Sequence, residues 1–259
     1  MELEDVLYEV DDGLAWITIN RPERMNAFRG RTVDELIECF NTAWTDSNVG
    51  VVALTGAGDK AFCTGGDQKQ KAETGDYGPT RTGRFAAVEL QRIIRDIPKP
   101  VIAAVNGAAV GGGHVLHVVC DLTIAADTAR FGQSGPKVAS FDGGLGAAAL
   151  ARAIGEKRAR EMWFLCKLYD AHTVERWGLV NSVVPAAELR NAVREAADDL
   201  LQRSPTALRL IKHCINADLE GVPTNLAFAA LDMLKATEES TEGASAFAEK
   251  RKPDFTRFR

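Results

Sequence analysis

The chain has 259 residues, of which 46% are hydrophobic and 26% are charged, and its net charge is -5. This length is enough to bury a full core, and the 36 acidic against 31 basic side chains, without a long basic run, exclude a dedicated nucleic-acid-binding protein. No apolar stretch reaches membrane-spanning length, and no basic and apolar leader precedes the first apolar segment, so we expect a cytoplasmic protein without a membrane partner. The five cysteines lack CxxC spacing and are predicted to be buried free thiols, with a zinc site as the weaker alternative.

The first half of the chain alternates short apolar strands with amphipathic helices. Strands are predicted at residues 14–19, 50–55 and 101–105, and the last two have the continuous apolar character of buried parallel strands. Strands that alternate with helices form right-handed βαβ units, and ligands of such sheets bind at the carboxyl ends of the strands. We therefore predict an α/β domain with its site at these ends.

Capping signals and one polar segment complete the predicted elements. Thr32 followed by Glu35 matches a capping box and predicts a helix start. Residues 69–83 have almost no apolar content, which predicts either a lid or a disordered insert. After residue 186 only helices are predicted, and Ser204 before a proline is typical of a helix N-terminus. An apolar face follows it at Ala207, Leu208, Ile211 and Ile215.

Two glycine-rich segments follow predicted strands. The first is residues 62–68, with Gly65 and Gly66, and the second is residues 106–114, with three consecutive glycines. Adjacent glycines let the backbone approach a ligand and turn N–H groups outward, as a developing oxyanion requires. A tight turn is the alternative for the first segment. A phosphate loop competes for the second, but neither the Lys-Ser/Thr ending nor the dinucleotide spacing is present.

A third polar segment spans residues 131–146 and contains one carboxylate, Asp142, whose structural alternative is a helix cap. His114 and His117 are three residues apart on an apolar helix. Because no further ligand has suitable spacing, we predict partly buried, hydrogen-bonded histidines and no metal site.

The order and spacing of these three segments resemble the crotonase (enoyl-CoA hydratase/isomerase) superfamily over essentially the whole chain. The resemblance implies an α/β crotonase (ClpP-like) fold of repeated ββα units, with a core domain at 1–195 and a C-terminal helical trimerisation or lid region at 196–259. It also implies an acyl-CoA substrate whose thioester enolate is held by the N–H groups of Gly66 and Gly112. No tightly bound cofactor and no metal are expected, and the assembly is a homotrimer or homohexamer.

Two departures from the hydratases narrow the function. Enoyl-CoA hydratases carry two glutamates that activate water, and this chain has Val115 and Gly135 at those positions. Neither residue can transfer a proton, so ordinary hydration is not expected.

The remaining motifs resemble the 1,4-dihydroxy-2-naphthoyl-CoA synthases (naphthoate synthases) of menaquinone biosynthesis, carbon–carbon lyases that close a ring by Claisen (Dieckmann-type) condensation. In one class of these enzymes a bound bicarbonate is the base. The matching anion-binding positions are Gln133, Ser134, Gly135 and Trp163, and Asp142 and Ser140 match catalytic residues. On local sequence, Trp163 equally fits a core aromatic. Coenzyme A or substrate contacts are implied for Arg24, Ala27, Thr64, Gly65, Asp67, Gln68, Tyr77 and Lys250.

Other positions leave alternatives open. Lys235 stands where the synthases have a C-terminal tyrosine. Residues 4–9, 21–30, 62–68 and 204–208 look more like 2-ketocyclohexanecarboxyl-CoA hydrolase, which opens a ring by the reverse reaction. A non-catalytic protein that binds acyl-CoA is the third alternative.

Overall fold

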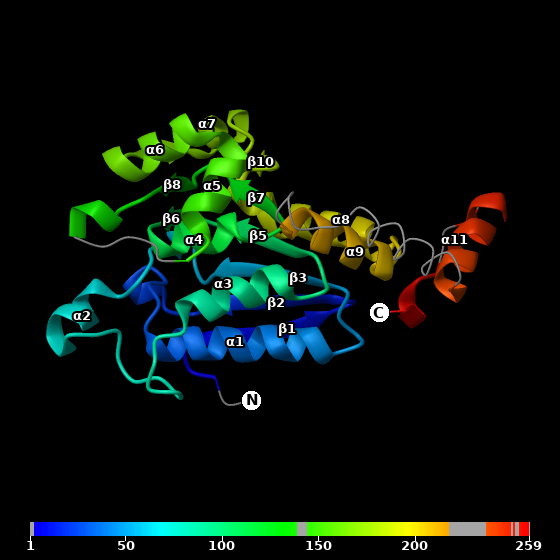
Figure 1. Cartoon of the computed structure of the whole chain (residues 1–259), viewed down its shortest axis with the longest axis horizontal. Helices are drawn as coiled ribbons and strands as arrows, with labels where there is room; N and C mark the ends of the chain where they lie inside the picture. Colours follow the sequence, from blue (N-terminus) through cyan, green and yellow to red (C-terminus); the bar gives the residue numbers. More distant parts are fainter. Residues whose placement is uncertain (1–2, 139–143, 218–236, 250, 252–253, 259) are drawn as a thin grey trace.

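A computed structural model describes residues 3–138, 144–217, 237–249, 251 and 254–258 (Figure 1). Its strands form a six-stranded sheet in the order β1-β2-β3-β5-β7-β10 and a four-stranded sheet in the order β4-β6-β8-β9. The strands are β1 (Val6–Asp11), β2 (Leu14–Ile19), β3 (Val51–Gly56), β4 (Ala61–Cys63), β5 (Val101–Val105), β6 (Ala108–Val110), β7 (Leu122–Ala126), β8 (Arg130–Gly132), β9 (Leu168–Asp170) and β10 (Ser182–Val184). The described α-helices are α1 (Gly30–Thr45), α2 (Gln68–Thr74), α3 (Ala87–Asp96), α4 (Gly112–Val118), α5 (Gly146–Ile154), α6 (Glu156–Leu165), α7 (Ala171–Arg176), α8 (Leu189–Leu201), α9 (Pro205–Asn216) and α11 (Glu238–Glu249).

A repeated pattern of two strands and a helix generates both sheets. In β3-β4-α3, β5-β6-α4 and β7-β8-α5 the first strand joins the large sheet and the second joins the small sheet. This confirms the predicted α/β crotonase-type fold of repeated ββα units. The strands β4, β6 and β8 are parallel neighbours, so their carboxyl ends lie along one edge of the small sheet. Each of the three segments singled out in the sequence contains the carboxyl end of one of these strands.

Two apolar cores cover the faces of the large sheet. Side chains alternate between the faces of a strand, so Ile17 and Leu54 pack with α1 and α3, whereas Trp16 and Ala53 pack with α8. The predicted strands at 50–55 and 101–105 are therefore buried on both faces, as their continuous apolar character indicated. The boundary proposed at residue 195 falls within α8, and the division into two domains stays a prediction.

The capping box predicted at Thr32 is wrong. Helix α1 begins at Gly30, and the Thr32 hydroxyl accepts a hydrogen bond from the backbone N–H of the N-cap residue Arg29. Glu35 does not turn back to the helix start, because its buried carboxylate accepts the backbone N–H of Asp5 at 2.8 Å. Glu35 therefore anchors the N-terminal strand and does not cap its own helix.

The polar segment at residues 69–83 is also not one irregular loop. Its first part belongs to α2, because the Asp67 side chain accepts the backbone N–H groups of Lys69 and Gln70 and so caps the helix. The helix ends at Gly75, whose φ of 88° suits a residue without a Cβ. Only the remainder, which contains Tyr77, is an extended connection to α3.

The predicted start of α9 is confirmed, with Ser204 as N-cap and Pro205 in the first turn. Lys212 fastens this helix to the core, because its ammonium group donates to the carbonyl of Ile94 at 3.0 Å and pairs with Asp121 at 2.7 Å. All five cysteines are free, but Cys214 on α9 is exposed, in contrast to its predicted burial. None of the helices that the structure describes combines the length and apolar character needed to cross a membrane.

Candidate active site

A cavity of about 320 Å³ lies where the three polar segments meet. Both predicted oxyanion glycines, Gly66 and Gly112, line it, and so do the four predicted anion-binding positions, Gln133, Ser134, Gly135 and Trp163. Its remaining walls come from α1, α3, α4 and their adjoining loops, through Phe28, Val33, Thr64, Gly65, Gln68, Tyr77, Phe85, Ala87, Val88, Leu90, Gln91, Gly111, Leu116 and Gly144.

The first two glycine segments touch each other at the cavity. A Cβ placed on Gly65 would lie 3.0 Å from the backbone nitrogen of Gly112. On Gly112 it would lie 2.6 Å from the ring of Phe28, and on Gly66 it would lie 2.5 Å from the ring of Tyr77. A side chain at Gly65 is disfavoured by the positive φ of 84° and would press on the backbone of Gly112, whereas one at Gly66 or Gly112 would require the ring of Tyr77 or Phe28 to shift.

Both predicted oxyanion donors are available. The backbone N–H of Phe28 donates to the carbonyl of Gly65 at 2.8 Å, and the carbonyl of Phe28 accepts the N–H of Asp67 at 2.9 Å. The N–H of Gly66, which lies between Gly65 and Asp67 in the chain, takes no part in this pairing. Gly112 is the first residue of α4, where an N–H has no acceptor within the helix. Within residues 3–138 and the other described segments, neither N–H has an acceptor. Two such donors beside one cavity can stabilise a negatively charged oxygen.

A second group of hydrogen-bond donors lies on another wall. The indole Nε1 of Trp163 is buried and has no partner among the described residues. The Gln133 side chain is 2% exposed, and its Nε2 lies 3.2 Å from Nδ1 of His114. Ser134 places its hydroxyl against Gly111, where a Cβ would lie 2.9 Å from Oγ. The amide, hydroxyl and indole are neutral donors suited to a small anion.

No acidic, basic or imidazole side chain appears among the described residues that line the cavity. Of the two positions that carry glutamates in hydratases, Gly135 lines the cavity and Val115 is 1% exposed in the apolar core. The predicted catalytic residues Ser140 and Asp142 lie outside the described residues. The described walls therefore supply hydrogen-bond donors and apolar surface, but no carboxylate.

The residues implied in substrate binding are only partly brought together. Thr64, Gly65, Gln68 and Tyr77 line the cavity, and the Tyr77 hydroxyl accepts a hydrogen bond from Gln68 at 3.2 Å. The exposed Arg24, together with Ala27 and Asp67, is not among the lining residues, and Lys250 lies outside the described residues.

Two polar residues escaped the sequence interpretation. Gln91 on α3 is 5% exposed and lines the cavity, and its Oε1 accepts the backbone N–H of Leu145 at 2.7 Å. It thus holds the end of the third segment in place. A glutamine within an amphipathic helix carries no motif that marks such a role.

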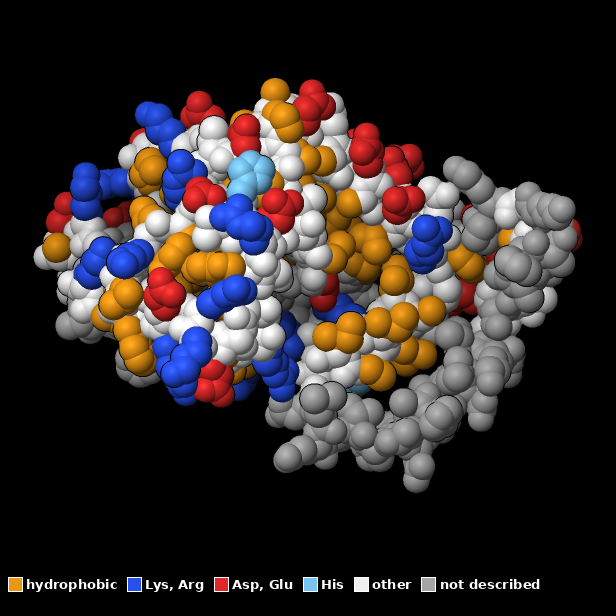
Figure 2. Space-filling view, turned by 90° about the horizontal axis from the view of Figure 1, so that it is seen from above, with side chains coloured by type: hydrophobic (Ala, Val, Ile, Leu, Met, Phe, Trp, Pro, Cys, Tyr) orange, Lys and Arg blue, Asp and Glu red, His pale blue; other side chains and the backbone are white. Residues whose placement is uncertain are grey.

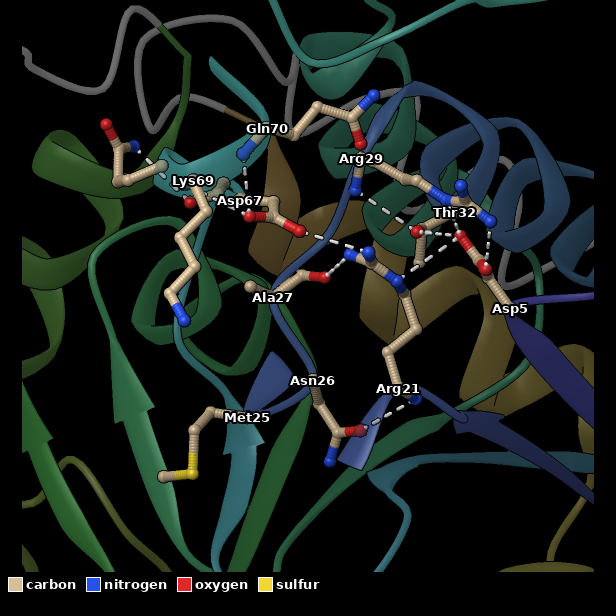
Figure 3. A network of polar contacts seen from close by, with 12 residues as sticks. Asp5, Arg21, Met25, Asn26, Ala27, Arg29, Thr32, Asp67, Lys69 and Gln70 are labelled. Carbon is tan, nitrogen blue, oxygen red and sulfur yellow. Dashed lines mark hydrogen bonds and ion pairs between the residues drawn. The ribbon is translucent and has the colours of Figure 1, made fainter. Parts of the chain in front are cut away.

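Arg21 is the other residue that was missed, and it explains the placement of Ala27 and Asp67. Its guanidinium pairs with Asp67 at 3.0 Å and with Asp5 at 3.7 Å, and it also donates to the carbonyl of Ala27 (Figure 3). Arg21 is 7% exposed and Asp67 is 4% exposed. This buried network ties the N-terminal strand to the first glycine segment, so Asp67 positions the loop and does not face the cavity.

The charge of Asp67 is maintained by its partners. Burial by itself raises the pKa of Asp67, but the backbone N–H of Gln70 and the guanidinium of Arg21 outweigh burial and hold the pKa below 3.8. The pair therefore stabilises the fold above the ordinary pKa of an aspartate, and this contribution is lost as the pH falls through the lowered folded-state pKa.

Replacing Arg21 with methionine is expected to lower the free energy of unfolding by about 3–5 kcal/mol, because Asp67 is left buried without its counter-ion. Urea denaturation at neutral pH measures the loss. The double variant Arg21→Met/Asp67→Asn removes the stranded charge and should recover part of the stability. The difference between the wild type and Arg21→Met should also shrink as the pH falls from about 4 toward the lowered pKa of Asp67. Equal losses in the single and double variants at every pH would contradict this role.

The histidine prediction needs correction. His114 and His117 are 0% and 1% exposed, so they are fully and not partly buried. They are also only half satisfied, since Nε2 of each ring has no hydrogen-bond partner among the described residues.

Comparison with known proteins places the chain and its fold in a family. The sequence pattern of the enoyl-CoA hydratase/isomerase family matches residues 9–257, and the chain belongs to that family. Its structure is similar to that of an enoyl-CoA hydratase from Bacillus anthracis, with 31% identity, a TM-score of 0.88 and coverage of 98% of this chain and 99% of that chain. DspI from Pseudomonas aeruginosa is 30% identical, with a TM-score of 0.88 and coverage of 98% and 97%.

A third similar structure is an enoyl-CoA hydratase/carnithine racemase from Magnetospirillum magneticum, which is 30% identical, with a TM-score of 0.84 and coverage of 98% of this chain and 96% of that chain. Membership of this family makes the protein a crotonase-superfamily enzyme that acts on acyl-CoA thioesters.

Proposed function

We propose that the protein closes a ring by intramolecular Claisen condensation of an acyl-CoA thioester, with 2-succinylbenzoyl-CoA as substrate. The proposal is carried by two features that occur together at the cavity. The first is that the N–H groups of Gly66 and Gly112 have no acceptor among the described residues. The second is that the described walls contain neutral hydrogen-bond donors and no carboxylate. An enolate needs the first feature. A small anion that serves as the base needs the second.

The proposed reaction begins with removal of a proton α to the thioester. Charge develops on the thioester oxygen, and preorganised N–H donors stabilise it without further reorganisation. A bicarbonate ion held by Gln133, Ser134 and Trp163 would accept the proton, since Gly135 leaves room for it where a hydratase carries a glutamate. The enolate carbon then forms a bond to the carbon of the protonated carboxyl group of the substrate, its C–OH bond breaks, and Asp142 gives one proton to the hydroxyl, which leaves as water. The α-proton taken up by bicarbonate would restore the proton of Asp142.

Hydration fits the site poorly, although relatives are named as hydratases. Addition of water to an enoyl-CoA needs groups that activate the water and protonate the α-carbon. Gly135 has no side chain, and Val115 is a buried apolar residue. Crotonyl-CoA is therefore the substrate that separates this protein from its hydratase relatives.

An assay with purified protein tests the proposal directly. Turnover of 2-succinylbenzoyl-CoA that rises with added bicarbonate supports ring closure, whereas turnover of 2-ketocyclohexanecarboxyl-CoA alone supports the ring-opening alternative. Turnover of crotonyl-CoA alone would overturn both. Binding of all three thioesters without turnover would favour the non-catalytic alternative.

Replacing Trp163 with phenylalanine is expected to raise the bicarbonate concentration for half-maximal rate by about 10- to 100-fold, because it removes one hydrogen bond to an anion while keeping an aromatic ring. Initial rates at graded bicarbonate concentrations measure the change. Trp177→Phe is the matched control, because Trp177 stacks on Tyr169 and is not among the residues that line the cavity. An unchanged requirement in Trp163→Phe would remove the indole from the proposed anion site.

The proposed enzyme is a homotrimer, or a homohexamer built from trimers. Part of the apolar face predicted for α9 supports assembly, since Ile211 and Ile215 are 55% and 71% exposed in the single chain. Figure 2 shows hydrophobic side chains gathered between the main body and the end formed by α11, over the region where Figure 1 places α8 and α9. Exposed aliphatic side chains on one helix face are typical of a subunit contact.

A further inference from the structure

A buried imidazole pair lies directly behind the proposed anion pocket. His114 and His117 belong to α4, and their ring centroids are 4.7 Å apart in an edge-to-face arrangement. His114 reaches the cavity wall through Gln133, with 3.2 Å between Nδ1 and Nε2 of the carboxamide. His117 is held from the other side by the Thr123 hydroxyl, 3.3 Å from its own Nδ1. Neither ring lines the cavity, so neither is available to a substrate.

The contact between His114 and Gln133 defines which atom donates. The Nε2 of a glutamine is a donor only, so Nδ1 of His114 must be the acceptor and must carry no proton. The imidazole is then neutral, with its proton on Nε2. Burial agrees with this, since it lowers the pKa of His114 to about 3. The pKa of His117 is lowered as well, first by burial and then by the neighbouring His114.

The consequence concerns the half of the carboxamide that faces the cavity. An unrestrained glutamine rotates its terminal amide and presents either a carbonyl oxygen or N–H groups. Donation of one N–H to His114 fixes the Nε2 end toward α4 and leaves the second N–H of that nitrogen free for another acceptor. Because both amide hydrogens are on Nε2, holding this nitrogen in place also fixes the direction of the second N–H, and an anion that meets this N–H is stabilised.

We propose that His114 is a positioning residue, which orients the carboxamide of Gln133 so that its second N–H is directed to an anion in the cavity. The anion itself belongs to the proposed function, and the inference rests on it in that respect. His117 supports the arrangement by packing its ring against His114 while bonded to Thr123 on β7. The role requires an acceptor at the position of Nδ1 and not a histidine as such.

This requirement defines the variants. In His114→Asn, the side-chain oxygen lies close to the place of Nδ1 and keeps the acceptor. In His114→Leu, the volume stays similar and the acceptor is lost. We expect the leucine variant to need about tenfold more bicarbonate for half-maximal rate, the effect of one lost hydrogen bond to an anion site. The asparagine variant should stay within about threefold of the wild type, and kcat at saturating bicarbonate should change little in either.

The outcomes separate positioning from packing. An unchanged bicarbonate requirement in His114→Leu overturns the proposal. Equal losses in the leucine and asparagine variants, accompanied by equal falls in melting temperature, also overturn it, because they show that only the shape of the ring mattered. Restoration by asparagine alone supports it.

A spectroscopic measurement tests the hydrogen bond without any turnover. In protein labelled with ¹⁵N-histidine, Nδ1 of His114 should give the signal of an unprotonated ring nitrogen at neutral pH, and this signal should shift in Gln133→Leu. His114→Asn assigns the resonance. A protonated Nδ1 overturns the inference. If Nδ1 is unprotonated but turnover does not depend on bicarbonate, the hydrogen bond to Gln133 is supported and the role of His114 in directing an anion is overturned. In that case it is the proposed function that has failed.

Discussion

Replacing Gly112 with proline is expected to lower kcat/KM by about 10²–10³-fold, the loss that follows removal of one oxyanion donor. Proline removes the N–H at this position and puts its ring Cδ in place of the hydrogen, and the first turn of a helix tolerates proline because that N–H has no partner within the helix. The loss should appear mainly in kcat, since the donor acts on charge that develops in the transition state. Steady-state rates with the ring-forming thioester measure it.

The matched control is Gly112→Ala, which keeps the N–H and adds the same Cβ. Both variants meet the ring of Phe28, since a Cβ on Gly112 would lie 2.6 Å from its Cζ. The ratio of the two rates therefore removes the shared contact of the Cβ with Phe28 and reports the loss of the N–H together with the ring carbons that replace it. Equal rates in both variants would show that this amide does not hold the enolate oxygen.

Asp142→Asn is expected to reduce kcat by about 10²–10⁴-fold, the range for loss of a group that transfers a proton. Asp142 itself lies outside the described residues, but Gly144, two positions later, lines the cavity beside Gln91. Asparagine keeps the size of the side chain and removes its ability to exchange a proton near neutral pH. Rates with the ring-forming thioester and calorimetric binding of the same compound distinguish a chemical defect from a binding defect.

Asp127→Asn serves as the control for this substitution, because Asp127 is exposed in the turn after β7 and does not line the cavity. Undiminished turnover in Asp142→Asn would exclude the proton-transfer role. Thioester binding by a wild-type protein that turns over no candidate substrate would leave the non-catalytic alternative.

The fold could be predicted because its main signals are local. Continuous apolar runs such as residues 101–105 indicate strands buried on both faces. Glycines after each run indicate backbone that packs closely against a neighbouring segment. The three polar segments follow parallel neighbouring strands, so their meeting at one edge is a consequence of strand order. Local signals gave a wrong prediction where a side chain bonds to a residue far along the chain. Glu35 was predicted to cap its own helix, but its carboxylate accepts the backbone N–H of Asp5.

By itself, the sequence determined where glycine leaves the backbone without side chains and which strands are buried. Its resemblance to hydratases showed that Val115 and Gly135 stand where those enzymes have glutamates. Only the tertiary structure decided the partners of the buried polar groups: Arg21 with Asp67, 46 positions along the chain, and Gln91 with Leu145, 54 positions along. The physical reason is that conformational preference is a property of a few adjacent residues. The partner of a buried charge or amide depends on which remote segments the two sheets bring together.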